Sequence, residues 1–125
     1  MPKTFFGNAE ILHNTPYEAI SVLVDKTTTG TVIENGRTIL KAGAILSGDG
    51  ASIFADRTKK VKVETNPSEA TYVDGILLYD VDVTEKDAVA SLVYRGTLRE
   101  DKIGSGTVDA NVKSKLSHIQ FVKGA

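Results

Sequence analysis

The sequence contains no cysteine and no tryptophan, and it has only two histidines and three prolines among its 125 residues. Without cysteine, the chain cannot form a disulfide, a thiolate zinc site, an iron–sulfur cluster or a cysteine nucleophile. Aromatic residues make up only 6% of the chain, which leaves few rings on which bases or sugars could stack. No apolar run approaches the roughly 20 residues that span a bilayer. We therefore expect no membrane partner, and no secretory signal follows Lys3.

An excess of one charge sign is also missing. The chain has 15 Lys and Arg against 16 Asp and Glu, a formal net charge of −1. Sequence-independent binding to nucleic acid depends on an excess of basic residues, so we expect no nucleic-acid partner. A content of 41% hydrophobic and 25% charged residues is typical of a folded domain. The length fits one such domain.

What the chain does contain favours strands and turns. It has thirteen threonines and eleven glycines. Threonine is β-branched and suits a strand, whereas glycine is common in turns. We therefore expect a mostly β domain.

Alternating or β-branched residues predict the individual strands. Asn35-Gly36 is a strong signal for a two-residue hairpin turn. The segment 73–83 (VDGILLYDVDV) is the longest expected strand, buried on both faces at its start and on one face at its end. Gly96 is expected to break the last long strand. The patterns predict strands at 19–25, 31–34, 37–41, 60–65, 73–83 and 88–95, with extended chain at 42–46 and 97–103.

One helix is expected, at 109–118. Asp109 can accept hydrogen bonds from the free backbone N–H groups at its start. Val112, Leu116 and Ile119 share one face and form an apolar stripe. A short strand at 121–122 then ends the pattern.

Residues 1–18 show neither the strand period nor the helix period. We interpret them as an extended N-terminal arm that precedes a single domain at 19–125. Their apolar residues would be exposed unless the arm packs against something. The alternative is an edge strand that folds onto the domain's own core.

Motifs for phosphate, dinucleotide or nucleophile chemistry are missing: the sequence has no P-loop, no G-x-G-x-x-G and no G-x-S-x-G. His13 and His118 are too few for a typical zinc site. Ser117 precedes His118, but adjacent residues rarely face each other. We therefore predict that the protein is not an enzyme and has no cofactor and no metal site.

Two clusters of charge remain. Asp80 and Asp82 share one face of the expected long strand, within a stretch at 74–87 that contains five acids. We interpret this stretch as a solvated rim, with a divalent cation at a subunit contact as the alternative. The basic cluster is interpreted as a charged edge strand, with an acidic partner surface as the alternative. It comprises Arg57, Lys59, Lys60 and Lys62.

Two stretches resemble a known family. Residues 32–46 (VIENGRTILKAGAIL) contain an Asn-Gly-Arg-x-Ile-x-x-Ala-Gly segment, and residues 75–103 begin with GILLYDVDVT. A helix and a final His-Ile-x-Phe strand, which includes His118 and Phe121, follow. In this order they resemble the head decoration proteins of tailed bacteriophages, the lambda-type capsid-stabilising family, in the versions found in phages and prophages of Gram-positive hosts. The resemblance covers about 90 residues. It departs at Glu85-Lys86-Asp87, where family members often have a glycine-containing turn.

The resemblance implies a small β-barrel or β-tulip-like domain of the α+β class, with one short C-terminal helix. It implies a structural virion protein on the outer surface of the mature capsid, made in the host cytoplasm. Trimers at three-fold and quasi-three-fold sites would clamp neighbouring capsomers. The partners would be a major capsid protein with the HK97-like fold and further copies of the chain itself.

The N-terminal arm is the expected capsid contact. An extended segment can add a strand to an exposed sheet edge. The alternatives are an adhesive module for host cells or glycans, a small hydrolase based on Asp80, Asp82 and His118, and a β-rich domain with another purpose. The arm residues expected to bind the capsid are Lys3, Thr4, Phe5, Phe6, Ile11 and Leu12.

Overall fold

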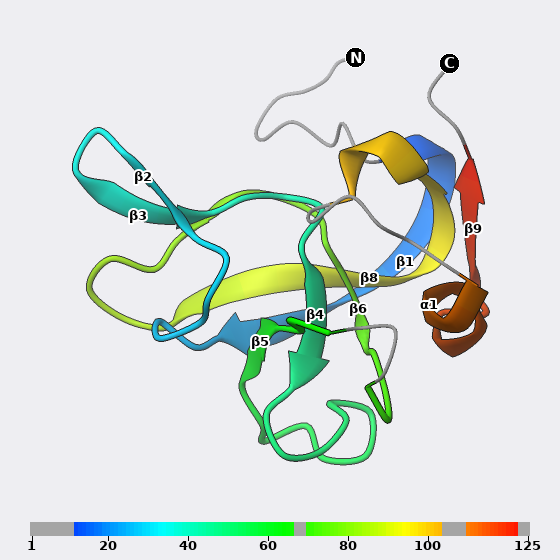
Figure 1. Ribbon diagram of the computed structural model, residues 1–125, viewed down its shortest axis with the longest axis horizontal. Helices are drawn as coiled ribbons and strands as arrows, with labels where there is room; N and C mark the ends of the chain where they lie inside the picture. The colour runs from blue at the N-terminus through cyan, green and yellow to red at the C-terminus, as the bar shows by residue number, and fades with distance from the viewer. Residues whose placement is uncertain (1–11, 67–69, 104–109, 123–125) are drawn as a thin grey trace.

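The computed structural model describes residues 12–66, 70–103 and 110–122 (Figure 1). Strand accounts for 45% and helix for 8% of the residues of the structure. The expected mostly β class with a short helix near the C-terminus is therefore confirmed. The strands are β1 (Leu12–Val24), β2 (Val32–Glu34), β3 (Arg37–Leu40), β4 (Ile45–Gly48), β5 (Val61–Val63), β6 (Gly75–Leu77), β7 (Val81–Asp82), β8 (Ala88–Arg99) and β9 (Ile119–Val122); the helices are the 3₁₀ turn Glu100–Lys102 and α1 (Ala110–Lys115).

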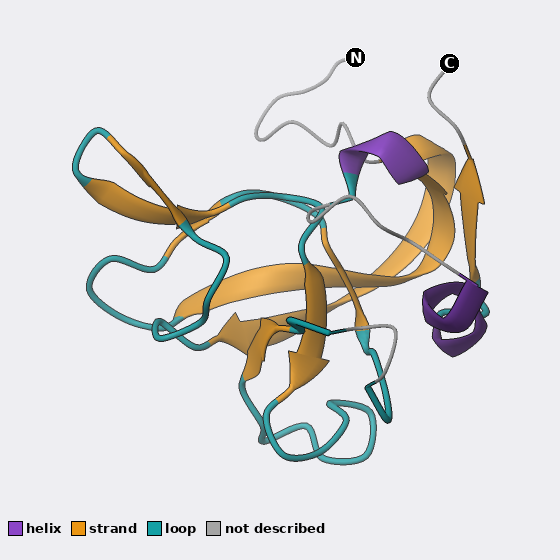
Figure 2. Ribbon diagram, in the orientation of Figure 1, coloured by secondary structure: helices purple, strands orange, loops and turns teal. Residues whose placement is uncertain are grey.

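The described strands form two sheets (Figure 2). The larger has the order β1-β5-β4-β6-β8-β9, and β1 pairs in addition with β8. Strand pairing therefore runs from β1 through β5, β4, β6 and β8 back to β1. The long antiparallel ribbon of β1 and β8 crosses the molecule, whereas the smaller sheet, β2-β3-β7, stands out at one end.

The core consists of two clusters on either side of β6. Ile76 lies in the cluster that α1 and β9 cover, whereas Leu77 lies in the cluster between β1, β4 and β5. Both side chains are fully buried. Because successive side chains of a strand point to opposite faces, β6 contributes to both clusters. Burial on both faces at the start of this strand is as the sequence predicted.

The Asn35-Gly36 hairpin is confirmed. Glu34 pairs with Arg37 across the turn. Asn35 has φ 52° and Gly36 has φ 77°, the left-handed conformations that a type I′ turn requires at both central positions. Asparagine and glycine are the residues that adopt these conformations at least cost.

The prediction of one strand over 73–83 is wrong. The chain leaves the larger sheet after Leu77 and joins the smaller one at Val81. Between them, the Asp80 carboxylate accepts a hydrogen bond of 2.7 Å from the backbone N–H of Ala42. This contact lies where the segment passes from one sheet to the other.

The first strand is longer than expected, because β1 begins at Leu12 rather than at Ala19. Residues 12–18, which we expected in the arm, therefore belong to a strand that pairs with β8. The register shifts three times between Leu12 and Ala19. Such bulges interrupt the alternation of inward and outward residues, which explains why this segment has no period in the sequence.

The last long strand and the helix also differ in their bounds. β8 continues through Gly96 to Arg99, so the expected break is wrong. Helix α1 spans six residues, Ala110–Lys115, and Asp109 lies outside the described residues. The apolar stripe is nevertheless confirmed, because Val112 and Leu116 are 1% and 5% exposed and pack in the core.

Candidate functional site

The expected capsid-binding residues are almost entirely outside the described part of the chain. Lys3, Thr4, Phe5, Phe6 and Ile11 lie there, as does the rest of segment 1–11. Leu12 begins β1 opposite Leu98.

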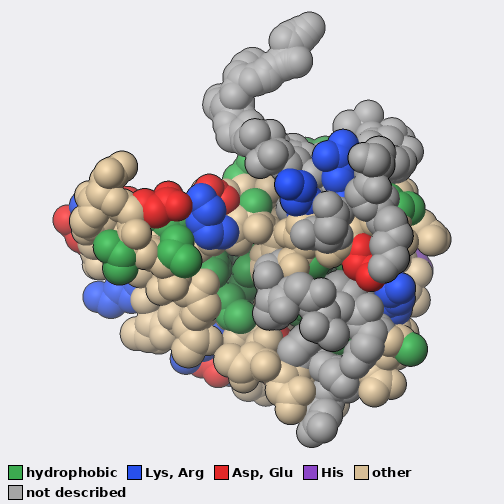
Figure 3. Space-filling view, turned by 45° about the horizontal axis from the view of Figure 1, so that its top comes forward, with side chains coloured by type: hydrophobic (Ala, Val, Ile, Leu, Met, Phe, Trp, Pro, Cys, Tyr) green, Lys and Arg blue, Asp and Glu red, His purple; other side chains and the backbone are tan. Residues whose placement is uncertain are grey.

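An exposed apolar surface lies on the hairpin of β2 and β3, which we call the hairpin lobe (residues 32–40). Val32 is 42% exposed and Ile33 is 70% exposed. Figure 3 shows this end of the molecule standing apart, with hydrophobic, acidic and basic side chains close together. A second exposed pair is Leu23 and Val89, which face each other across β1 and β8. Because Val32 and Ile33 are consecutive in β2, they present apolar side chains on both faces of the hairpin.

Ion pairs connect the hairpin lobe and Lys41 to the segment at 80–82. Arg37 Nε lies 2.8 Å from Asp82, and Lys41 Nζ lies 3.0 Å from Asp80 and 3.1 Å from Glu34. The two aspartates of the predicted acidic rim are therefore engaged with cations on or beside β3. Among the residues that the structure describes, no group of three metal-ligating side chains comes together. The arrangement favours a structural role for Asp80 and Asp82 over a cation site.

The pKa of Asp82 is lowered from 3.8 to about 2, first because Arg37 donates a hydrogen bond to it and then because Thr84 does. A carboxylate with a lowered pKa in the folded state stabilises the fold above its unfolded pKa, and this contribution disappears as the pH falls through its folded pKa. We expect the difference in urea midpoint between the wild type and Asp82→Asn to be constant at neutral pH and to vanish between about pH 4 and 2. A difference that persists unchanged at pH 2 would contradict this assignment.

The basic cluster is partly paired rather than forming a continuous surface. Arg57 donates to the carbonyl of Ser21 at 3.1 Å, and Lys60 Nζ lies 2.7 Å from Asp87. Asp87 also accepts the backbone N–H of Lys26. These contacts connect the ends of β1, β5 and β8.

A buried carboxylate organises the loop after β4. Asp74, only 4% exposed, accepts hydrogen bonds from the backbone N–H groups of Gly48 at 2.7 Å and Ile53 at 2.9 Å. Its second oxygen accepts the hydroxyl of Ser52 at 2.5 Å. The hydroxyl of Tyr72 donates to the carbonyl of Gly48 at 2.6 Å. Four hydrogen bonds thus fix the loop at 48–53 against the segment before β6.

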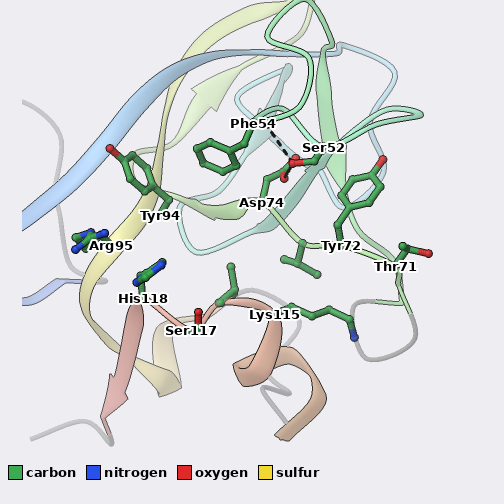
Figure 4. A pocket seen from close by; sticks show the side chains of 12 residues that line it. Ser52, Phe54, Thr71, Tyr72, Asp74, Tyr94, Arg95, Lys115, Ser117 and His118 are labelled. Atoms are coloured by element: carbon green, nitrogen blue, oxygen red, sulfur yellow. Dashed lines mark hydrogen bonds between the residues drawn. The ribbon is translucent and has the colours of Figure 1, made fainter.

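Beside this loop lies a pocket of about 490 Å³, the ring pocket (Figure 4). The Phe54 and Tyr94 rings meet edge to face on one side, with centroids 5.3 Å apart and planes at 70°. Arg95 follows Tyr94 on β8 and lies on the same side as that ring, whereas His118 from the turn before β9 and Lys115 from the C-terminal end of α1 lie below the rings in this view. The lining residues are Ser52, Phe54, Thr71, Tyr72, Val73, Asp74, Tyr94, Arg95, Lys115, Leu116, Ser117 and His118.

Sequence analysis did not find the ring pocket. The pocket is formed where β8 contacts three segments that are separate in the sequence, 52–54, 71–74 and 115–118. A local sequence motif does not predict such long-range contacts. His118 was examined as a base for Ser117, and the structure places both on the rim of this pocket. His13 lies in β1, where only its backbone is described.

No protein-family model and no curated protein sequence matches the chain. Within the described residues, no helix is long and apolar enough to cross a bilayer.

Proposed function

We propose that the protein is a structural virion protein that binds the outer surface of a mature phage capsid. In this proposal it forms trimers at three-fold and quasi-three-fold sites and clamps neighbouring capsomers. The partner is a major capsid protein with the HK97-like fold. The protein has no catalytic role.

The observation that carries the proposal is the contact between the two stretches that resemble the decoration family. In the structure, Ile39 and Leu40 of the first stretch pair with Asp82 and Val81 of the second. The backbone N–H of Gly43 donates to the carbonyl of Leu77 at 2.8 Å. Residues that resemble one family in two distant stretches thus form one structural unit, as expected if the resemblance reflects a shared fold.

The roles of the acidic residues support a mechanical function. Asp74 fixes the loop at 48–53, Asp80 connects to Lys41 and Ala42, and Asp87 connects to Lys60 and Lys26. Each carboxylate joins segments that are distant in the sequence. Such cross-connections stiffen a small domain. A stiff domain suits a clamp that holds capsomers together against the pressure inside the capsid.

The hairpin lobe supplies a candidate contact in addition to the arm. Ile33, at 70% exposed, offers apolar area on a hairpin that ion pairs connect to the segment at 80–82. Burial of apolar surface contributes about 25 cal/mol per Å². Even a modest contact is effective when it is repeated around a closed shell.

The arm is tested by a deletion whose end the structure defines. Removal of residues 2–11 leaves all of β1, because that strand begins at Leu12. We expect the truncated chain to keep its circular dichroism spectrum and thermal unfolding and to lose binding to expanded heads in co-sedimentation. A chain with residues 2–11 replaced by a Gly/Ser segment of equal length should also lose binding, because Phe5, Phe6 and Ile11 are gone.

Ile33→Asp provides an independent test of the hairpin lobe. The side chain is exposed, so the domain should fold normally, whereas head binding should weaken at least about tenfold (1.4 kcal/mol). Wild-type binding by both the truncated chain and Ile33→Asp would overturn the proposed contacts.

A further inference from the structure

We infer that the ring pocket is a binding site for a carboxylated sugar. The proposed binding is separate from capsid attachment and does not require the capsid. It depends on four features of the pocket: aromatic walls, cationic side chains, hydroxyl groups and size.

Several of the few aromatic residues of the chain line the pocket. The protein has four tyrosines and four phenylalanines, and three of these eight, Phe54, Tyr72 and Tyr94, line this one hollow. Phe54 is 50% exposed, although a phenylalanine is usually buried. Its edge-to-face contact with Tyr94 holds the ring in place. The result is a fixed apolar wall, against which the C–H face of a sugar ring can pack.

The charge of the lining is suited to an anion. Arg95, Lys115 and His118 bring basic groups to the pocket, and among the described residues Asp74 is the acidic one that lines it. The Asp74 oxygens already accept three hydrogen bonds from the loop at 48–53. Arg95 pairs with Glu18 at 3.4 Å, and both side chains are more than half exposed. An exposed pair of this kind contributes little, so a ligand carboxylate can replace Glu18 and accept two N–H groups from Arg95.

Hydroxyl groups and volume favour a sugar over other anions. Thr71 and Ser117 line the pocket, and their hydroxyl groups suit those of a sugar. The Ser52 and Tyr72 hydroxyls donate to Asp74 and to the carbonyl of Gly48, so toward a ligand they can act only as acceptors. A volume of about 490 Å³ lies within the range of about 300–1,000 Å³ typical of small-ligand sites. The backbone N–H groups of Gly48 and Ile53 beside the pocket donate to Asp74. They are therefore not available to cradle a phosphate, which favours a carboxylate.

The test is an NMR titration of the ¹⁵N-labelled full chain with methyl glucuronide, with the neutral methyl glucoside as the matched ligand. We expect saturable shifts of the amides at 94–95 and 117–118 with the glucuronide. The glucoside should bind at least about tenfold more weakly, because it lacks the carboxylate.

Variants assign the binding to this pocket. Arg95→Gln and Phe54→Ala should each weaken glucuronide binding about tenfold, because one removes the carboxylate partner and the other the apolar wall. Lys86→Gln removes one positive charge from an exposed residue outside the pocket, and it should bind like the wild type. Three outcomes would overturn the inference: no saturable shifts, equal affinity for the glucoside, or tighter binding of adenosine monophosphate than of the glucuronide. Equal weakening by Lys86→Gln would overturn it as well.

Discussion

Replacement of Asp74 by alanine is expected to lower the free energy of unfolding by about 2–6 kcal/mol, because two buried backbone donors lose their acceptor at about 1–3 kcal/mol each. Those donors are the N–H groups of Gly48 and Ile53, both in buried residues. The carboxylate is only 4% exposed and shields both donors from solvent, although water from the ring pocket can recover part of the loss. For a domain whose total stability is about 5–15 kcal/mol, this is a large fraction. Urea unfolding followed by circular dichroism measures the loss.

Asp80→Ala is the matched control for this prediction. Like Asp74, Asp80 accepts a backbone N–H, that of Ala42. Unlike Asp74, it forms an ion pair, with Lys41. It is exposed, however, so water takes over the hydrogen bond and the loss should stay below about 1 kcal/mol. Equal losses in the two variants would contradict the central role assigned to the buried carboxylate.

Gly75→Ala is expected to destabilise the protein by about 3 kcal/mol, near the upper end of the usual cost of overpacking. A Cβ atom at position 75 would lie 2.4 Å from the carbonyl oxygen of Val93 and 2.6 Å from Cδ2 of Leu92. The oxygen belongs to the backbone of β8, so the two strands must separate to admit the methyl group. The midpoint of thermal unfolding should fall accordingly.

Gly36→Ala is the control that separates the steric clash at Gly75 from the cost of placing alanine in a left-handed conformation. Gly36 has φ 77° and nothing within 4 Å of an added Cβ, so only its left-handed conformation is penalised, at about 1–2 kcal/mol. If Gly75→Ala cost no more than Gly36→Ala, the close approach of β6 and β8 would not be as the structure describes it.

Local chemistry explains which parts of the fold the sequence predicted. Asn35-Gly36 requires two left-handed residues in a row, and few residue pairs allow that, so the hairpin was predicted correctly. Val112, Leu116 and Ile119 were likewise correctly predicted to be buried together, although the helix ends at Lys115 and Ile119 belongs to β9. In both cases the decisive interactions lie within a few residues of each other.

Tertiary contacts explain what the sequence did not predict. The break in 73–83 accompanies pairing of β7 with β3 and a hydrogen bond between Asp80 and Ala42, which are 38 residues apart. The early start of β1 was hidden by three register shifts. The ring pocket combines Phe54, Tyr94 and His118 from separate segments. No pattern within a single segment contains these relations, so sequence periodicity could not reveal them.

The proposed clamp and the ring pocket are compatible on one molecule. The hairpin lobe lies at the end of the molecule formed by the smaller sheet, whereas the pocket lies between the loop at 48–59 and the turn after α1 (Figures 1 and 4). A protein fixed to a shell through one end could therefore present a ligand pocket at another. The two proposals are tested by different experiments and can fail independently.

The most direct test of the proposed function is co-sedimentation of the full chain with cognate heads, both unexpanded and expanded. The proposal predicts saturable binding to expanded heads alone, near one copy per capsid subunit, because trimers would occupy the three-fold and quasi-three-fold sites of the mature shell. Binding to neither form, or equal binding to both, would contradict it.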